Sequence, residues 1–380
     1  MNQTPSSLYI HIPFCAQKCA YCDFVSFAAK PDFRMEYMKC LTKELQMIGT
    51  KYDKPILKTI FVGGGTPSLL TVEEIEMLGQ VVHENFDMTG IEEFSIEANP
   101  GTLVNEALFK WRSIGVNRIS MGVQSMNDVL LKKLGRIHTS EVVRSSFATL
   151  RECDFDNINL DIMFGLPDQT YEDMMDTVEK IIELGPEHVS AYSLKIEEGT
   201  PFDRLVDEEK IHLPDEDEDR KMYHGLVKRL SEAGYGQYEI SNFAKEGLPC
   251  NHNLVYWKGQ PYFAAGMAAH GYVDGVRIGN HMDFESYKTD IQDGKFPEAT
   301  REVIDQDDAA FEYIMLGLRL NEGVDVVEYN SLYKRDIEKD FKSVIKMQVE
   351  SGALEIVAGF MRLTEYGRDI ANVVIAEFLD

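Results

Sequence analysis

Residues 8–22, Leu-Tyr-Ile-His-Ile-Pro-Phe-Cys-Ala-Gln-Lys-Cys-Ala-Tyr-Cys, join a strand pattern to a loop with three cysteines. Five more strand patterns follow along the chain, and a helical pattern separates each from the next. Repeated βα units of this length predict a parallel sheet, and six right-handed units curve into part of a barrel. Eight units would close the barrel, and only six are found. The six predicted strands are Leu8–Ile12, Lys58–Val62, Glu93–Ala98, Arg118–Gly122, Ile158–Phe164 and Val189–Ser193.

The pattern changes after Ser193. Pro214–Ala233 predicts a helix, Gly234–Phe243 predicts a strand, and Cys250–Arg301, rich in Gly, His, Tyr and Asn, predicts irregular structure. From Asp305 three helical segments precede two alternating segments, which predicts a winged-helix-like domain. The predicted fold class is therefore α/β, a partial (β/α)6 TIM-like barrel with a small C-terminal α+β domain. The predicted boundaries are 1–235 for the barrel, 236–304 for a connecting region and 305–380 for the C-terminal domain.

The charge of the chain narrows the classes of partner. Lys and Arg number 38 against 64 Asp and Glu, a net charge of -26. This excess argues against nucleic acid and anionic lipid surfaces, because phosphates need basic partners. No apolar run is long enough to span a bilayer, and the first residues lack the pattern of a secretory signal. We therefore expect a cytoplasmic protein without membrane insertion.

The loop after the first strand carries the pattern Cys-x3-Cys-x2-Cys. One short loop can place Cys15, Cys19 and Cys22 on three irons of a [4Fe–4S] cluster. The fourth iron then lacks a protein ligand, and the amino and carboxylate groups of S-adenosylmethionine (SAM) can chelate it. Zinc is the alternative, but structural zinc usually takes four ligands, and the nearest further candidate, His11, lies inside a predicted strand. The spacing favours the cluster.

Polar residues follow the predicted strands, at the edge where parallel barrels bind ligands. A run of three glycines, Gly63–Gly65, lets a ligand approach the backbone closely, although a tight turn explains such a run equally well. Together the polar residues suit a zwitterionic, cationic molecule that carries a ribose. They are Glu97, Asn99, Gln124, Arg136, Asp161 and Lys195.

Several ordered motifs resemble one known family. They are YIHIPFC, GGGTP, SIEANP, GVQS and DIMFGLP, and they are similar to motifs of the oxygen-independent coproporphyrinogen III oxidase-like radical SAM proteins. The resemblance runs from Tyr9 to the C-terminal domain and implies a radical SAM barrel with a C-terminal extension. It also implies that SAM contacts Tyr9, Gly64, Gly65, Thr66, Glu97, Gln124, Arg136, Asp161 and Lys195.

The family has two main branches. The oxidase branch carries a longer N-terminal arm and a further cysteine two residues after the third ligand. Here Tyr9 lies almost at the start, and the residue at that further position is Phe24. The haem chaperone branch is marked by C-D-F after the third cysteine and by an H-N-x-x-Y-W motif. Both features are present, the second as His252–Trp257, so the resemblance favours the chaperone branch.

The H-N-x-x-Y-W motif has the residue types of a haem site. His252 offers an axial nitrogen, Tyr256 and Trp257 can stack on the macrocycle, and Asn253 can orient the histidine or bind a propionate. A histidine beside aromatic residues is also a common feature of protein cores. His270 and His281 are rival axial ligands.

Two functions follow from these patterns. The favoured one is a carrier that binds the cluster, SAM and haem and delivers haem to apo-haemoproteins such as respiratory cytochromes. The alternative is radical oxidative decarboxylation of the propionates of coproporphyrinogen III. The expected partners are the haem-receiving proteins, some of them in membranes, and an electron donor such as flavodoxin or ferredoxin. Whether the chain cleaves SAM as an enzyme, and whether it forms a homodimer, stays open at this point.

Overall fold

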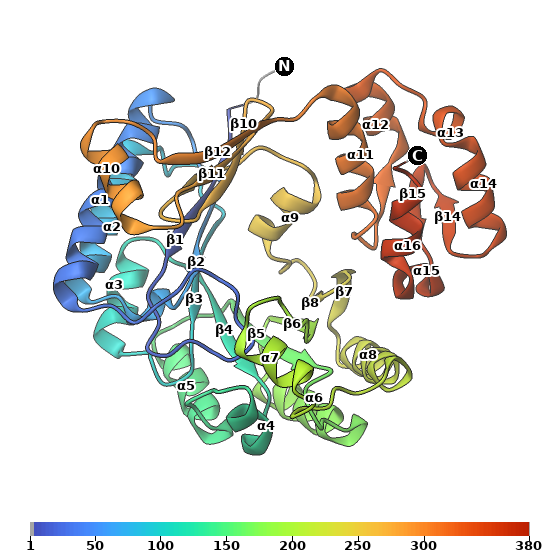
Figure 1. Ribbon diagram of the computed structural model, residues 1–380, viewed down its shortest axis with the longest axis horizontal. Coiled ribbons are helices and arrows are strands. Elements are labelled where there is room, and N and C mark those ends of the chain that lie inside the picture. The colour runs from blue at the N-terminus through green and yellow to red at the C-terminus, as the bar shows by residue number, and fades with distance from the viewer. Residues whose placement is uncertain (1–3, 380) are drawn as a thin grey trace.

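The computed structural model describes residues 4–379, and a nine-stranded sheet forms its larger part (Figure 1). The strand order is β7-β8-β6-β5-β4-β3-β2-β1-β9. The six predicted strands, β1 to β6, pair parallel and in chain order. Since β7 and β9 stand at opposite ends of this order, the barrel stays open, as the sequence predicted.

Helices cover the outside of the barrel and connect its strands (Figure 1). Two of them, α2 and α6, begin with capping boxes, in which Thr71 pairs with Glu74 and Thr170 with Asp173. The elements are β1 (Ser7–Ile12), α1 (Pro31–Lys51), β2 (Thr59–Gly64), α2 (Val72–Asn85), β3 (Glu93–Ala98), α3 (Asn105–Ser113), β4 (Arg118–Gln124), α4 (Asp128–Lys133), α5 (Ser140–Glu152), β5 (Ile158–Phe164), α6 (Tyr171–Leu184), β6 (His188–Ser193), α7 (Pro201–Asp207) and α8 (Glu216–Glu232).

The strands alternate between an apolar and a polar side. Ile10, Val62 and Ile96 represent the apolar side and belong to the main core beneath the helices. The other side faces the inside of the barrel, where buried polar residues bond to one another across strands, as Thr59 does to Ser7 (2.9 Å) and Asn159 to Ser120 (2.8 Å). The inner side of the barrel therefore carries buried polar residues that are hydrogen-bonded to one another.

The prediction of irregular structure over Cys250–Arg301 is wrong. This stretch contains two helices and four strands, and β9 extends the main sheet by pairing parallel to β1. The predicted strand Gly234–Phe243 is instead an antiparallel pair of short strands that extends the opposite end. The elements are β7 (Gly236–Glu239), β8 (Asn242–Ala244), α9 (Asn251–Trp257), β9 (Phe263–Ala265), β10 (His270–Val273), β11 (Val276–Asn280), α10 (Phe284–Gln292) and β12 (Glu298–Val303).

The C-terminal domain has a hydrophobic core of its own, separate from that of the barrel. Its helices and three-stranded sheet β13-β15-β14 give the expected α+β composition. The elements are α11 (Gln306–Gly317), β13 (Val324–Asp325), α12 (Val326–Tyr333), α13 (Ile337–Asp340), α14 (Lys342–Glu350), β14 (Leu354–Val357), β15 (Phe360–Leu363), α15 (Glu365–Asp369) and α16 (Ala371–Ala376).

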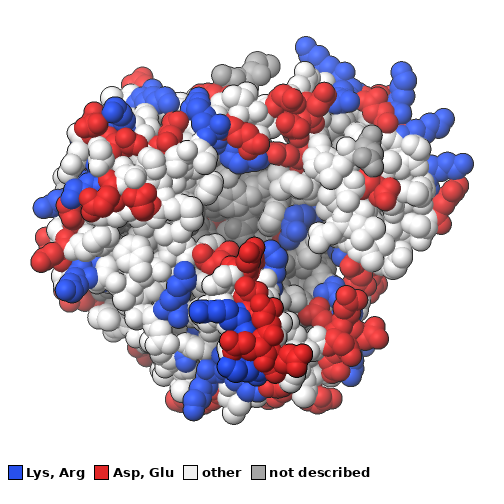
Figure 2. All heavy atoms as spheres, viewed as in Figure 1, with Lys and Arg blue, Asp and Glu red and all other residues white. Residues whose placement is uncertain are grey.

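The surface carries its charge unevenly. In Figure 2 acidic side chains gather over α7 and α8, where α8 begins with an acidic run over residues 215–219. Lys and Arg side chains project from the outer edge of the C-terminal domain in the same view. Within residues 4–379, no helix combines the length and the apolar character that crossing a membrane requires.

Candidate functional site

The cysteine loop leaves β1 at the mouth of the barrel and is held there by backbone hydrogen bonds. Cys15 donates its amide to Phe27 (3.1 Å), and Ala20 donates to Leu134 at the end of α4 (3.3 Å). The Cys15 thiol lies 3.5 Å from the Thr66 hydroxyl, just after the glycine run. The loop is thus anchored to both sides of the mouth.

The three thiols have the chemistry that a cluster requires. Cys15, Cys19 and Cys22 are free and partly exposed, and burial raises the pKa of the Cys22 thiol. Cys19 and Arg136 line one cleft, and the Arg136 Nε is buried without a partner. Within residues 4–379, no three His, Cys, Asp or Glu side chains are arranged closely enough to hold a metal ion. Three thiolates are the donor type that a [4Fe–4S] cluster takes, so the residues of the loop fit this group in kind.

Neighbouring atoms of the protein itself pack closely against the glycine run, Gly63–Gly65. A Cβ on Gly64, whose φ is +109°, would lie 2.4 Å from the His11 ring, and one on Gly65 would lie 2.6 Å from the Phe14 carbonyl oxygen. The Gly64 amide donates to Glu97 (2.9 Å). These glycines are needed for close packing of β1 against β2. Less of their backbone is therefore open to a ligand than the sequence suggested.

Two carboxyl groups face the inside of the barrel near its mouth. Burial, reinforced by the nearby Asp161, raises the pKa of Glu97 to about 7. Burial also raises the pKa of Asp161, which accepts from Asn159 (2.6 Å) and Ser120 (3.3 Å). Tyr9 lies close to Glu97 and donates its hydroxyl to His11 (3.0 Å). Two buried carboxyl groups with raised pKa values suit a cationic ligand, because a nearby positive charge favours their ionised form.

Arg136 and Gln124 complete the opposite wall. Arg136 donates to Asn99 (2.9 Å) and to the Gly122 carbonyl (3.0 Å). Gln124 ends β4 with a φ of +68°, a left-handed conformation that is rare for a residue with a side chain. Such strain persists where surrounding contacts hold it.

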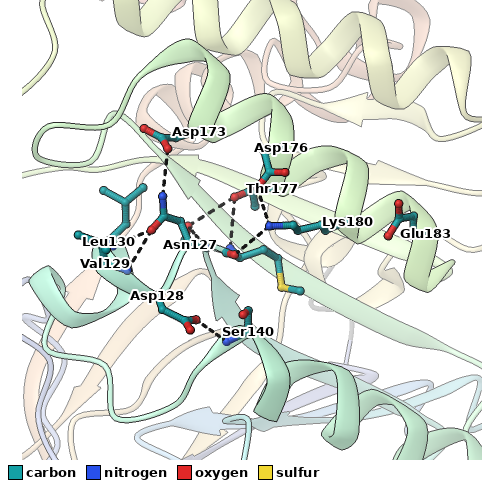
Figure 3. Close-up of polar contacts among 12 residues, drawn as sticks. Asn127, Asp128, Val129, Leu130, Ser140, Asp173, Asp176, Thr177, Lys180 and Glu183 are labelled. Atoms are coloured by element: carbon teal, nitrogen blue, oxygen red, sulfur yellow. Dashed lines mark hydrogen bonds and ion pairs between the residues drawn. The ribbon is translucent and has the colours of Figure 1, made fainter.

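Those contacts come from the loop after β4, shown in Figure 3. Asn127 caps α4 and donates to Asp173 of α6 (3.0 Å). The Met126 amide donates to the Thr177 hydroxyl (3.2 Å), and the Met126 carbonyl accepts from Lys180 (3.5 Å). Helix α6 thereby fixes the turn that presents Gln124.

Lys195 does not join the other predicted SAM residues. Its side chain is 78% exposed and pairs with Glu197 at 2.8 Å. It follows the last barrel strand, as expected, but its side chain lies in solvent. The structure brings together Tyr9, Gly64, Gly65, Thr66, Glu97, Gln124, Arg136 and Asp161 around the mouth and leaves Lys195 on its rim.

The H-N-x-x-Y-W motif forms α9, which lies against the inner side of the barrel. Glu93 of β3 accepts from the amides of Asn251 (2.7 Å) and His252 (3.3 Å) at the start of this helix. A buried carboxylate at a helix N-terminus is favourable, because four amides there lack intrahelical partners. The motif is thereby fixed inside the fold.

His252 has no free nitrogen in this arrangement. Its Nδ1–H donates to Thr59 (2.8 Å), whose own proton goes to Ser7, and its Nε2 accepts from the Tyr256 hydroxyl (2.9 Å). Burial lowers the pKa of His252 to about 3, so the ring is neutral. The residue predicted as the axial ligand thus has both ring nitrogens hydrogen-bonded inside the barrel in this arrangement.

The other predicted haem residues point in different directions. Trp257 lies under the Arg319 guanidinium, 4.6 Å from the ring centroid, and Asn253 is half-buried on the same helix. His281 bonds to Asp290 (2.9 Å). His270 is exposed at the start of β10. The motif residues do not surround one open face.

Sequence reasoning missed the ring stack inside the barrel. The His252 ring stacks on Phe61 (centroids 5.5 Å apart), and Phe61 stacks on Tyr9 (6.4 Å). His11 then donates to the Val25 carbonyl in the cysteine loop (3.0 Å). Period-two alternation in β1 and β2 places Tyr9, His11 and Phe61 on one side and is the signal that could have found them.

Comparison with known proteins agrees with this fold. Residues 9–181 match the Radical SAM superfamily, and residues 304–370 match the HemN C-terminal domain. Barrel and cysteine loop thus define a protein of the radical SAM class. The chain is 38% identical to the heme chaperone HemW of Bacillus subtilis, over 98% of this chain and 99% of that protein. It is 36% identical to HemW of Escherichia coli, over 99% and 98%. The chain therefore belongs to the HemW family.

A solved structure shows the same fold. Coproporphyrinogen III oxidase (HemN) from Escherichia coli, described as a radical SAM enzyme, superposes with a TM-score of 0.85. The alignment covers 99% of this chain and 90% of that one at 22% identity. At this identity the likeness concerns the architecture, including the C-terminal domain.

Proposed function

We propose that this chain is a radical SAM haem chaperone of the cytoplasm. It holds a [4Fe–4S] cluster and SAM at the barrel mouth, binds haem and delivers it to apo-haemoproteins such as respiratory cytochromes. The observation that carries the proposal is full-length identity of 36–38% to relatives named heme chaperone HemW. The free thiols at the mouth support it from the structure.

Different residues at the mouth bind the cluster and SAM. Cys15, Cys19 and Cys22 ligate three irons, and the open iron of such a cluster supplies a coordination position for SAM. Arg136, with its unpaired Nε, takes the carboxylate of the methionyl group. Glu97 and Asp161 face its cationic groups, which lower the free-energy cost of their ionisation.

Haem requires an axial nitrogen that the fold leaves accessible. His252 serves only if Tyr256 releases its Nε2, which moves part of α9. The exposed His270 offers a nitrogen without such a rearrangement. The proposed partners are the haem-receiving proteins and an electron donor of the flavodoxin or ferredoxin type. The chain is also proposed to form a homodimer.

One anaerobic experiment tests these parts together. Reconstituted protein is reduced, its electron paramagnetic resonance spectrum is recorded with and without SAM, and haem is then titrated while the Soret band is followed. We expect a cluster signal that changes with SAM and a saturable Soret shift. Cys19→Ala should lose iron and sulfide, and Cys40→Ala, a buried cysteine of α1, should keep them. A cluster signal that does not change with SAM would refute SAM binding at the cluster. The absence of a Soret shift would refute haem binding.

A further inference from the structure

Buried polar atoms without partners gather where the barrel meets the C-terminal domain. In the described part of the chain, eleven buried side-chain nitrogen or oxygen atoms have no hydrogen-bond partner, and five lie at this junction. Such atoms cost free energy unless a ligand or ordered water meets them. The five are Glu239 Oε2, Asn242 Oδ1, Trp257 Nε1, Arg319 Nε and Asn321 Oδ1.

Arg319 is the cation of this group. It follows the end of α11, and its guanidinium lies over the Trp257 ring, 4.6 Å from the centroid. Its nearest acidic oxygen, on Glu239, is 3.7 Å away, too far for a hydrogen bond. A guanidinium that stacks on an indole and keeps its donors open is suited to bind a carboxylate.

Glu239 is the acidic neighbour of that guanidinium, in an ion pair whose closest atoms are 3.7 Å apart. Its side chain is fully buried, and its Oε1 already accepts from the Ser241 amide (3.0 Å) and the Asn242 side chain (2.5 Å). Burial raises the pKa of Glu239. Because Glu239 Oε1 is used by Ser241 and Asn242 and Glu239 Oε2 stays beyond hydrogen-bond distance of Arg319, an incoming carboxylate can bond to the guanidinium more closely than Glu239 does.

The junction is open to solvent in part. Helices α9 and α11 lie next to one another across it, and Figure 2 shows the surface hollowed between the barrel and the C-terminal domain. The Arg319 side chain is 30% exposed. The two unpaired N–H donors, on Trp257 and Arg319, are themselves buried, so a ligand that enters through the exposed part of Arg319 must displace neighbouring atoms to meet them.

We propose that the Trp257 indole N–H and the Arg319 guanidinium form a carboxylate site and that this site takes a propionate of haem. The inference rests on the proposed haem binding and adds the residues that recognise the propionate. Each donor gives one hydrogen bond to the carboxylate, and no covalent step is involved. Trp257 thereby contributes its N–H in addition to its ring.

The test compares haem with haem dimethyl ester, whose propionates carry no charge. Both are titrated into the full-length protein in the same detergent buffer, and the Soret band is followed. Arg319→Gln should weaken haem binding about ten- to a hundredfold and abolish the preference for haem over the ester. Trp257→Phe, which keeps a ring but loses the N–H, should lose about three- to tenfold for haem alone.

Two further variants separate recognition from folding. Glu239→Gln removes the competing charge and should tighten haem binding, which a purely structural role does not predict. Arg362→Gln, whose guanidinium is already paired with Glu355 at 2.7 Å, should bind as wild type. Wild-type protein that binds neither porphyrin would refute haem binding itself. Equal haem binding by wild type and Arg319→Gln, or equal losses for both porphyrins, would overturn the carboxylate site alone.

Discussion

Glu97 carries a raised pKa that should make stability depend on pH. The folded pKa is about 7 against 4.5 for the free side chain, so between these values the folded state keeps a proton that the unfolded state has lost. The contribution of Glu97 to the free energy of unfolding therefore falls as pH rises from 4.5 through 7. Above pH 7, Glu97→Gln should be more stable than wild type without SAM by about 1–3 kcal/mol.

Urea denaturation at pH 5 and pH 8 measures this difference. The advantage of Glu97→Gln should be small at pH 5 and full at pH 8, and SAM should stabilise wild type more than the variant, since the charged carboxylate attracts the cation. A variant with the same advantage at both pH values would show that the Glu97 carboxyl does not titrate in this range.

His252 provides a second test at the scale of one residue. Because both of its ring nitrogens are bonded inside the barrel, His252→Gln should lower the free energy of unfolding by about 1–3 kcal/mol and leave the spectrum of the ferric haem complex unchanged. His188→Gln is the matched control, since His188 is equally buried and bonds to Asn159 (2.7 Å) and Tyr238 (2.9 Å). A changed ligand-field spectrum in His252→Gln alone would restore His252 as the axial ligand.

At the scale of elements, the sequence predicted what local patterns encode. The six barrel strands, their parallel pairing and the cysteine loop follow from alternation and from the βα order, and the comparisons confirm this fold. The short strands β9 to β12 were missed because each depends on partners far along the chain, as β9 depends on β1. The hydrogen bonding of both His252 ring nitrogens was missed for the same reason, since one partner, Thr59, lies 193 positions away in the chain.

Helix α9 depends on a single carboxylate. Glu93 accepts from the Asn251 and His252 amides, and its Oε1 also lies 3.3 Å from the Cys250 thiol, whose pKa burial raises to about 12. Glu93→Gln keeps the shape but replaces one acceptor oxygen with a donor, which should cost about 1–3 kcal/mol of stability. Urea denaturation checks this, with Glu92→Gln as control.

Glu92 is the neighbouring residue, and it is exposed and pairs loosely with Lys58 (3.6 Å). Its substitution should change stability by less than about 0.5 kcal/mol. Similar losses for the two variants would mean that Glu93 acts through general electrostatics and not through the start of α9.

At the scale of the whole molecule, two cores meet at a polar junction, so the C-terminal domain should unfold as a unit of its own. Its core is separate from that of the barrel, and the junction is held by contacts such as Asn321 to Gln237 (2.7 Å) and the Arg319–Glu239 pair. Met361 is fully buried in the smaller core, and Met361→Ala should destabilise that domain by about 2–5 kcal/mol. Calorimetry should show one transition shifted to lower temperature and a second left in place, while the cluster spectrum at the barrel mouth stays unchanged. If the whole profile moved together, the junction would couple both cores into a single cooperative unit, and haem bound there would then act on the SAM site through stability alone.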